Sequence, residues 1–167
     1  MERFTNNLWL LYERARHELF PAPGTLAPDL WVRLGVMPSF QSWFSIAILR
    51  EPQGQLTLLR REWDCVYDLD RFHLKIYNLD RLRITQTHQR FGYTESRKLT
   101  GIINRIELSP LPESMKETGF VIDGVTYKLE LRGLGREFEW KLFNERTKAI
   151  EPLTDYLLTG GDHTDIS

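Results

Sequence analysis

The sequence has one cysteine, Cys65, among its 167 residues, so the chain cannot form an internal disulfide. Small secreted domains commonly depend on several disulfides, and this class is therefore excluded. No apolar stretch approaches the ~20 residues that a membrane-spanning helix requires; the longest, at 44–49, has the length of a strand. Residues 1–7 include Glu2 and lack the cleavage site of a secretion signal. These absences predict a cytoplasmic protein without a membrane partner.

A strong charge of one sign is also lacking, because the formal net charge is −1 and the isoelectric point is about 6.4. Residues 60–105 contain ten basic and six acidic residues, whereas residues 106–167 contain seven and twelve. Nucleic-acid-binding domains usually have a clearly basic composition, so a nucleic-acid partner is disfavoured. The hydrophobic content of 41% and the length fit one globular domain, 1–167, with a polar tail at 162–167.

Short motifs of common active sites and cofactor sites are absent. The sequence contains no Gly-x-Gly-x-x-Gly, no Gly-Lys-Ser/Thr loop, no His-Glu-x-x-His, no Cys-x-x-Cys and no Gly-x-Ser-x-Gly. No cofactor is therefore expected, and a non-enzymatic role is favoured. Catalysis by residues distant in the sequence stays open, because such sites need no local motif.

The N-terminal half predicts two helices and a hairpin. Apolar residues at helical spacing indicate a helix over 6–19, and Pro28 and Gly35 suggest the limits of a second helix over 28–34. Alternating apolar residues predict strands at 42–50 and 55–63, and the first should lie inside the sheet because both of its faces are apolar.

The stretch 66–90 is ambiguous, and its first part, 66–79, fits either a helix or a strand. The alternation around Arg81–Thr85 favours a strand there. A helix at 95–107 follows from apolar residues at helical spacing, and a last helix should begin near Pro152 and end at Gly160-Gly161.

The firmest local signal is Asp123-Gly124, the residue pair that a tight type I′ hairpin turn favours. It joins a predicted strand at 120–122 to one at 125–131, and 138–142 supplies the third strand of a meander. Helices and strands do not alternate regularly, so the sequence predicts a single α+β domain. Its mainly antiparallel sheet should have the helices packed on one face.

Two groups of residues suggest metal chemistry. Asp64, Asp68, Asp70 and His73 offer oxygen and nitrogen ligands within ten residues, although turn, capping and surface roles explain them equally well. Asp123 with Glu139 and Lys141 loosely resembles the Asp…Glu-x-Lys pattern of metal-dependent nucleases. A tight turn already accounts for Asp123, and the metal-dependent hydrolase or nuclease is therefore the alternative interpretation.

Ten basic residues, interleaved with the aromatic residues Tyr77, Phe91 and Tyr93, suggest a nucleic-acid-binding module as a second alternative. Acidic residues are interspersed among them, which indicates ordinary surface ion pairs. The ten are Arg60, Arg61, Arg71, Lys75, Arg81, Arg83, Arg90, Arg97, Lys98 and Arg105.

The leading hypothesis is a non-enzymatic protein-binding domain of the adaptor or toxin-neutralising type known from bacteria. Such proteins share this size and a compact α+β body without catalytic motifs, which is an argument from architecture. Tryptophan and arginine residues beyond the needs of the core would anchor the interface. The candidates are Trp9, Trp31, Trp43, Trp63 and Arg61. Edge strands of the sheet also make a homodimer possible.

Overall fold

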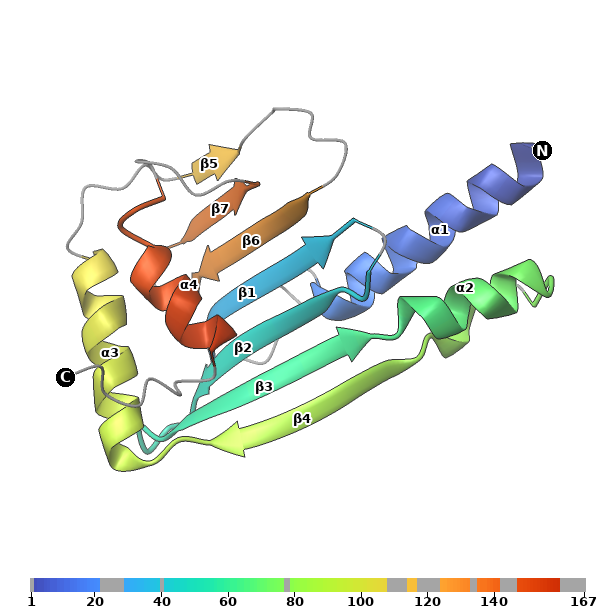
Figure 1. Cartoon of the computed structure of the whole chain (residues 1–167). Coiled ribbons are helices and arrows are strands. Elements are labelled where there is room, and N and C mark those ends of the chain that lie inside the picture. Colours follow the sequence, from blue (N-terminus) through green and yellow to red (C-terminus); the bar gives the residue numbers. More distant parts are fainter. Residues whose placement is uncertain are drawn as a thin grey trace.

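The computed structural model describes residues 2–21, 29–39, 41–76, 79–107, 114–116, 124–132, 135–141 and 147–159. Within these residues the chain forms a seven-stranded sheet and four α-helices, and the strand order is β4-β3-β2-β1-β6-β7-β5 (Figure 1). All neighbouring strands are antiparallel except the short β5, which runs parallel to β7. The predicted α+β class with a mainly antiparallel sheet is confirmed.

The first helix, α1 (Glu2–Leu19), confirms the helix predicted at 6–19. It buries Leu11, Ala15 and Leu19, which recur on one side of the helix. In the part of the chain that the structure describes, no helix has the length and apolar character needed to cross a bilayer.

The helix predicted at 28–34 is wrong, because residues 30–34 belong to strand β1 (Leu30–Pro38). β1 is the central strand and pairs antiparallel with β2 and with β6. A strand buried on both faces lacks the simple alternation of a half-exposed strand, and this is why the pattern misled. Gly35 does not end a helix but lies within β1, directly under the ring of Phe20.

The hairpin predicted at 42–50 and 55–63 is confirmed by β2 (Phe44–Arg50) and β3 (Leu56–Trp63). Their register pairs Phe44 with Glu62 and Arg50 with Leu56 without interruption. β2 lies between β1 and β3, as its two apolar faces predicted.

The ambiguous stretch begins with a helix, α2 (Cys65–His73), and continues through a short 3₁₀ turn, η2 (Leu79–Arg81), to β4 (Ile84–Arg90). Asp64 caps α2, since its side chain accepts a hydrogen bond from the backbone N–H of Tyr67 at 3.1 Å. The strand expected at 81–85 starts three residues later than predicted and forms the edge of the sheet.

The C-terminal half contains α3 (Tyr93–Glu107), β5 (Ser114–Lys116), β6 (Val125–Leu131), β7 (Arg136–Trp140) and α4 (Glu151–Leu158). α3 and α4 confirm the helices predicted at 95–107 and near Pro152. The antiparallel pairing of β6 with β7 agrees with the predicted meander. Asp123 and the strand predicted at 120–122 lie outside the described residues.

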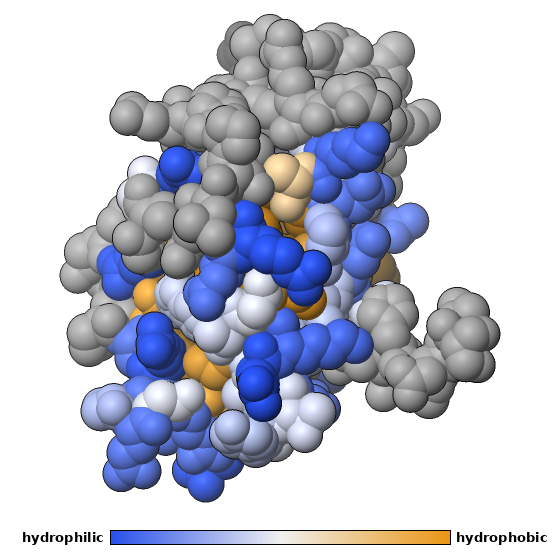
Figure 2. All heavy atoms as spheres, turned by 90° about the vertical axis from the view of Figure 1, so that its left-hand side faces the viewer, coloured by the Kyte–Doolittle hydropathy of each residue, from blue (hydrophilic) through white to orange (hydrophobic). Residues whose placement is uncertain are grey.

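α3 is amphipathic, and its outward side chains include the exposed Glu95, Arg97, Lys98 and Arg105. Figure 2 shows the end of the molecule on which α3 and α4 lie, where most of the visible described surface is polar and the apolar areas are small. The outer side of α3 is therefore mostly polar.

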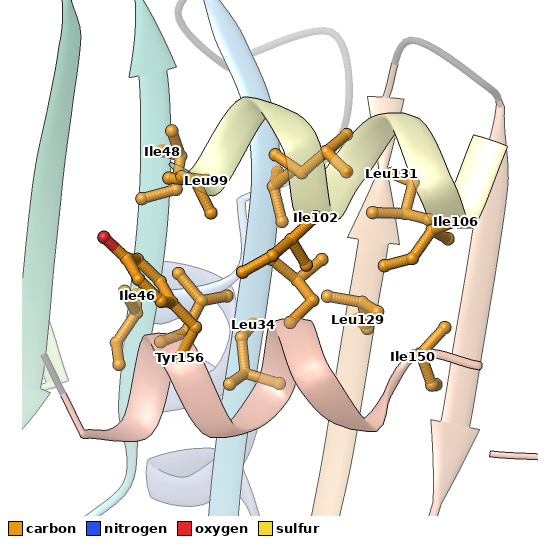
Figure 3. Packing of buried hydrophobic residues seen from close by; sticks show 14 of the residues in the cluster. Leu34, Ile46, Ile48, Leu99, Ile102, Ile106, Leu129, Leu131, Ile150 and Tyr156 are labelled. Carbon is orange, nitrogen blue, oxygen red and sulfur yellow. The ribbon is translucent and has the colours of Figure 1, made fainter. Parts of the chain in front are cut away.

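The inner sides of α3 and α4 pack on one face of the sheet (Figure 3). This core is aliphatic at its centre, where Leu34, Ile46 and Ile48 of the strands meet Leu99 and Ile103 of α3. All five side chains are at most 2% exposed. Burial of aliphatic side chains of this size contributes roughly 1.5–3 kcal/mol each, so this face supplies a large part of the stabilising apolar burial.

The opposite face of the sheet packs against α1. Phe20, next to the end of α1, covers Gly35, and a Cβ atom at this position would overlap the Phe20 ring. Arg33 on the same face is 3% exposed, and its Nε donates a hydrogen bond to Glu130 at 3.0 Å. The helices thus occupy both faces, with α3 and α4 together on one face and α1 on the other, and do not all pack on one face as the sequence predicted.

Candidate functional site

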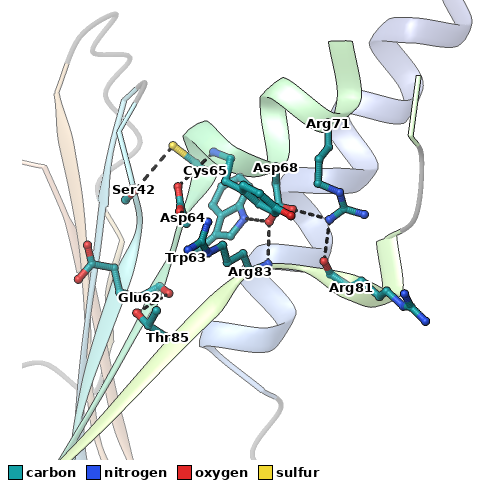
Figure 4. A network of polar contacts seen from close by, with 11 residues as sticks. Ser42, Glu62, Trp63, Asp64, Cys65, Asp68, Arg71, Arg81, Arg83 and Thr85 are labelled. Carbon is teal, nitrogen blue, oxygen red and sulfur yellow. Dashed lines mark hydrogen bonds and ion pairs between the residues drawn. The ribbon is translucent and has the colours of Figure 1, made fainter. Parts of the chain in front are cut away.

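The end of the molecule where α1 and α2 extend past the sheet contains a buried carboxylate, Asp68, in a polar network (Figure 4). Asp68 is 2% exposed and accepts hydrogen bonds from Trp63 Nε1, from the backbone N–H of Arg83 and from Arg71, each at 2.9 Å. Arg71 also donates to the carbonyl of Arg81 at 2.8 Å. The carboxylate therefore connects β3, α2 and the segment that leads into β4.

Asp64 and Cys65 have local structural roles in the same network. Asp64 caps α2 and lies 3.6 Å from the guanidinium of Arg83. Burial raises the pKa of the Cys65 thiol, and the negative charges of Asp64 and Asp68 raise it further. A thiol that is 1% exposed and held protonated is a poor nucleophile, so Cys65 fits a structural role.

The four candidate metal ligands do not gather around one point. Asp64 and Asp68 make the contacts described above, whereas Asp70 is exposed on the outer side of α2 and His73 is exposed at its last turn. Among the residues that the structure describes, no group of three or more His, Cys, Asp and Glu side chains could hold a metal ion. The sequence cluster thus reflects helix capping and one buried ion pair.

The second candidate, Asp123 with Glu139 and Lys141, is described only in part, because Asp123 lies outside the described residues. Glu139 and Lys141 lie at the end of β7, and Glu139 is half-buried opposite Lys128 of β6. The ammonium group of Lys128 forms ion pairs with Glu130 at 3.3 Å and with Glu137 at 2.9 Å, so these strands carry the ordinary cross-strand charge pairs of a sheet.

Several basic residues of the middle segment make contacts within the protein. Arg60 lies 3.1 Å from Glu62 and over the ring of Phe44, and Arg83 lies over the ring of Tyr67. Arg61 donates to the carbonyl of Glu18 at 2.6 Å and so attaches the last turn of α1 to β3. These contacts explain part of the basic segment without a nucleic-acid ligand.

The structure does not bring the four candidate tryptophans onto one surface. Trp63 is fully buried, and Trp43 packs edge-on against it at a centroid distance of 5.6 Å. Trp31 is half-buried under the guanidinium of Arg50. Only Trp9 is largely exposed, at 65%. Trp43 and Trp63 therefore serve the aromatic core between α1 and the sheet.

Trp9 belongs instead to a group of exposed apolar residues that was not predicted from the sequence. We call this group the α1–α2 patch, and its members are Trp9 and Leu10 on α1, Val66 and Tyr67 on α2, and Leu74 and Ile76 directly after α2. Figure 1 shows that α1 and α2 run alongside each other beyond the end of the sheet. Their inner sides share one core cluster, which fixes the two helices to each other.

The end of α2 explains why two apolar side chains are exposed there. Lys75 has a φ of 62°, and its N–H donates to the carbonyl of Phe72 at 2.9 Å. The N–H of Ile76 donates to the carbonyl of Arg71 at 2.9 Å, which completes a Schellman motif. The chain turns away from the helix axis here, and Leu74 is left 74% exposed.

One sequence signal could have identified part of the α1–α2 patch. Leu10 lies outside the apolar stripe that Leu11, Ala15 and Leu19 form on α1, so a helix that buries this stripe must expose Leu10. No comparable signal exists for Leu74 and Ile76, since they alternate with polar residues as in a half-buried strand.

Three hollows in the described surface contain none of the acidic residues that the sequence suggested as metal ligands. They have volumes of about 190, 250 and 400 Å³ and lie between α1 and β4, under the end of α1, and beside the end of α4. None of the three is lined by Asp64, Asp68, Asp70 or Glu139.

Comparison with known proteins gives no family: no protein-family model, no curated protein and no solved structure matches this chain. The geometry of the α1–α2 patch is therefore the basis for inferring a function.

Proposed function

We propose that this chain is a non-enzymatic protein-binding domain of the adaptor or toxin-neutralising type. It would contact its partner through the α1–α2 patch. The observation that carries this proposal is where the exposed apolar side chains lie: six of the eight large hydrophobic residues that are exposed among the described residues belong to α1, α2 or the residues directly after α2, and the inner sides of both helices share one core cluster. The other two, Tyr93 and Leu158, lie on α3 and α4.

Exposed apolar residues are normal when they are scattered, but a contiguous group is typical of a protein interface. The patch contains Trp9 and Tyr67, residue types that anchor many interfaces because they bury a large area with few rotatable bonds. Charged residues such as Arg14 and Asp70 border it on the same helices. An apolar centre with a polar border is the usual composition of an interface.

A rigid base supports the patch. The Asp68 network holds α2 against β3 and the segment before β4, and Tyr12 of α1 packs on Trp43 and Trp63 with centroid distances of 5.3 and 5.2 Å. Side chains that are already held in place lose less conformational entropy when they bind, which favours affinity.

The test compares Trp9→Ser and Leu74→Ser with Tyr93→Ser, a matched control on α3 that is 82% exposed. Each variant is used as bait in affinity capture from the extract of the native cell, and the captured proteins are identified by mass spectrometry. We expect a specific protein that wild type and Tyr93→Ser retain and that Trp9→Ser and Leu74→Ser lose. Removal of an interface anchor costs at least ~2 kcal/mol, about a thirtyfold loss of affinity.

Thermal unfolding measured in parallel separates binding from folding, because substitutions of exposed residues should change stability by no more than ~0.5 kcal/mol. The proposal is wrong if the captured proteins are the same for all variants, or if the purified wild type converts a substrate that Trp9→Ser converts equally well.

A further inference from the structure

Strand β4 forms one edge of the sheet, and no described helix or strand covers its outer side (Figure 1). All its residues from Thr85 to Arg90 are exposed, and its pairing with β3 is regular from Ile84 to Arg90. The strand therefore presents an uninterrupted row of backbone groups to the solvent.

The hydrogen bonds at both ends of the β3–β4 pairing show which backbone N–H and C=O groups of β4 point outward. The N–H of Phe91 donates to the carbonyl of Leu56, and the N–H of Asp64 donates to the carbonyl of Arg83. In an antiparallel ladder the residues that bond to one neighbour alternate with those that point away. Thr85, Thr87 and Gln89 thus bond to β3, and the N–H and C=O groups of Gln86, His88 and Arg90 point outward.

Natural edge strands are usually protected against pairing with the strand of another chain. The protection comes from proline, from lysine, from a bulge or from short length. β4 spans seven residues, contains neither proline nor lysine, and has no bulge in its register with β3. At the other side of the sheet, β5 has only three residues. Of the two edge strands that the structure describes, β4 is therefore the one that lacks the usual protection of a free edge.

We propose that β4 pairs antiparallel with β4 of a second copy of this chain, with the two-fold axis at Thr87. In this register Gln86 lies opposite His88 of the partner copy, and the outward groups of both residues form hydrogen-bonded pairs. With the carbonyl of Ile84 and the N–H of Arg90, the interface contains about six backbone hydrogen bonds. The two sheets would join into one continuous sheet.

The side chains of β4 suit this self-pairing. Thr87 faces Thr87 of the other copy, Thr85 faces Gln89, and Ile84 faces Arg90, so no like charges are directly opposite each other. Opposed threonines and threonine–glutamine pairs are favourable cross-strand neighbours. The register also places the start of α3, where Tyr93 is 82% exposed, next to segment 79–83 of the second copy, which contains Arg81.

A cysteine scan tests both the interface and its register. Thr87→Cys places two thiols opposite each other in a non-hydrogen-bonded pair, where the Cα atoms are ~4.5 Å apart and a disulfide can form. Thr85→Cys is the matched control, because in this register the two Thr85 positions are about four residues, or ~13 Å, apart. Wild type controls for Cys65, which is 1% exposed.

Under mild oxidation by oxidised glutathione, we expect the Thr87→Cys protein to become mostly a covalent dimer on non-reducing gels, while Thr85→Cys and wild type stay monomeric. A mixture of Thr85→Cys and Gln89→Cys should form the mixed dimer. Equal cross-linking of Thr85→Cys and Thr87→Cys, or none in either, overturns the proposal.

Analytical ultracentrifugation gives an independent measurement without cysteines. Thr87→Lys brings two positive charges directly opposite each other and should weaken the dimer about fivefold, whereas Thr85→Lys faces a glutamine and should leave it nearly unchanged. A wild type that sediments as a monomer at every concentration overturns the proposal. Trp9→Ser should dimerise normally, so the result is independent of the partner proposed for the α1–α2 patch.

Discussion

The two faces of the sheet are stabilised in different ways. On one face α3 and α4 cover a core whose centre is built from aliphatic side chains such as Leu34, Ile48 and Ile103. On the other side, α1 and α2 enclose aromatic residues together with buried polar groups, of which Asp68 is the best connected.

The difference teaches that the two sides should respond differently to the same kind of substitution. An aliphatic core tolerates a small loss of volume, since its contacts are non-directional. A buried carboxylate with three donors cannot be replaced by a residue of similar shape without leaving donors unpaired. Four predictions test this contrast, in order of decreasing effect.

The largest effect is expected for Asp68→Ala. The substitution leaves Trp63 Nε1 and the N–H of Arg83 without their acceptor and removes the ion partner of Arg71. Loss of one partner from a buried ion pair typically costs ~3–5 kcal/mol, and urea unfolding should show a decrease of this size. Asp70→Ala, on the exposed side of α2, is the matched control and should stay within ~0.5 kcal/mol of wild type. An equal loss for both variants would contradict the importance of the network.

Ile103→Ala on the aliphatic face should reduce the free energy of unfolding by about 3 kcal/mol, because it creates a cavity at a side chain that is 1% exposed. The conservative change Ile103→Val should cost only ~1 kcal/mol. By contrast, Asp68→Asn keeps the shape but turns an acceptor into a donor, and we expect it to cost about 2 kcal/mol. If Asp68→Asn were milder than Ile103→Val, the contrast between the faces would not hold.

Gly35→Ala should destabilise the protein by roughly 1–3 kcal/mol, because the new Cβ would overlap the Phe20 ring. The double variant Gly35→Ala with Phe20→Leu removes the aromatic ring from this contact. A double-mutant cycle should therefore show that the cost of Gly35→Ala is smaller in the Phe20→Leu background. Additive costs would mean that the close contact has no energetic role.

The smallest effect concerns alkaline pH and one tyrosine on each side of the sheet. Burial raises the pKa of Tyr12, helped by the charge of Cys65, and burial raises the pKa of Tyr156, helped by Glu95. As the pH rises, the hydroxyl groups of these tyrosines therefore lose their protons at a lower pH in the unfolded chain than in the folded protein. The associated stability is fully present below the ordinary tyrosine pKa near 10 and is lost as the pH rises through the folded values.

Thermal unfolding between pH 8 and 11 should therefore show a midpoint that falls less steeply in Tyr12→Phe and Tyr156→Phe than in wild type. Tyr93→Phe, at a position that is 82% exposed, is the control and should follow the wild-type curve. If the unfolding midpoint of both Tyr12→Phe and Tyr156→Phe fell with pH as steeply as that of wild type, the raised pKa values of the two tyrosines would be contradicted.

Local patterns predicted most of the elements because their periodicity reflects burial on one side. α1, α3 and the β2–β3 hairpin each present one apolar side or a clear alternation. β1 was mistaken for a helix because both of its faces are buried, so it lacks the alternation of a half-exposed strand. Burial of Arg33 in this strand depends on Glu130, which lies 97 residues away in the sequence, and no local pattern indicates a partner at this distance.

The candidate site was less predictable than the fold. Trp63 and Trp43 looked suitable for an interface by residue type, but both pack in the core between α1 and the sheet. Asp68 and Asp64 looked like metal ligands because sequence density cannot distinguish ligands from a cap and a buried ion pair. Exposure of the α1–α2 patch arises from how two helices pack, which only the three-dimensional structure defines.

The position of β1 between β2 and β6 has a consequence for synthesis of the chain on the ribosome. Strands β1 to β4 can assemble once residue 90 has left the exit tunnel, but the edge of β1 that pairs with β6 stays open until residue 131 follows. Nascent chains with an open central strand are exposed to mispairing and to chaperone binding. We expect ribosome-bound chains that end between these two points to be sensitive to proteases and to gain resistance only when β6 emerges.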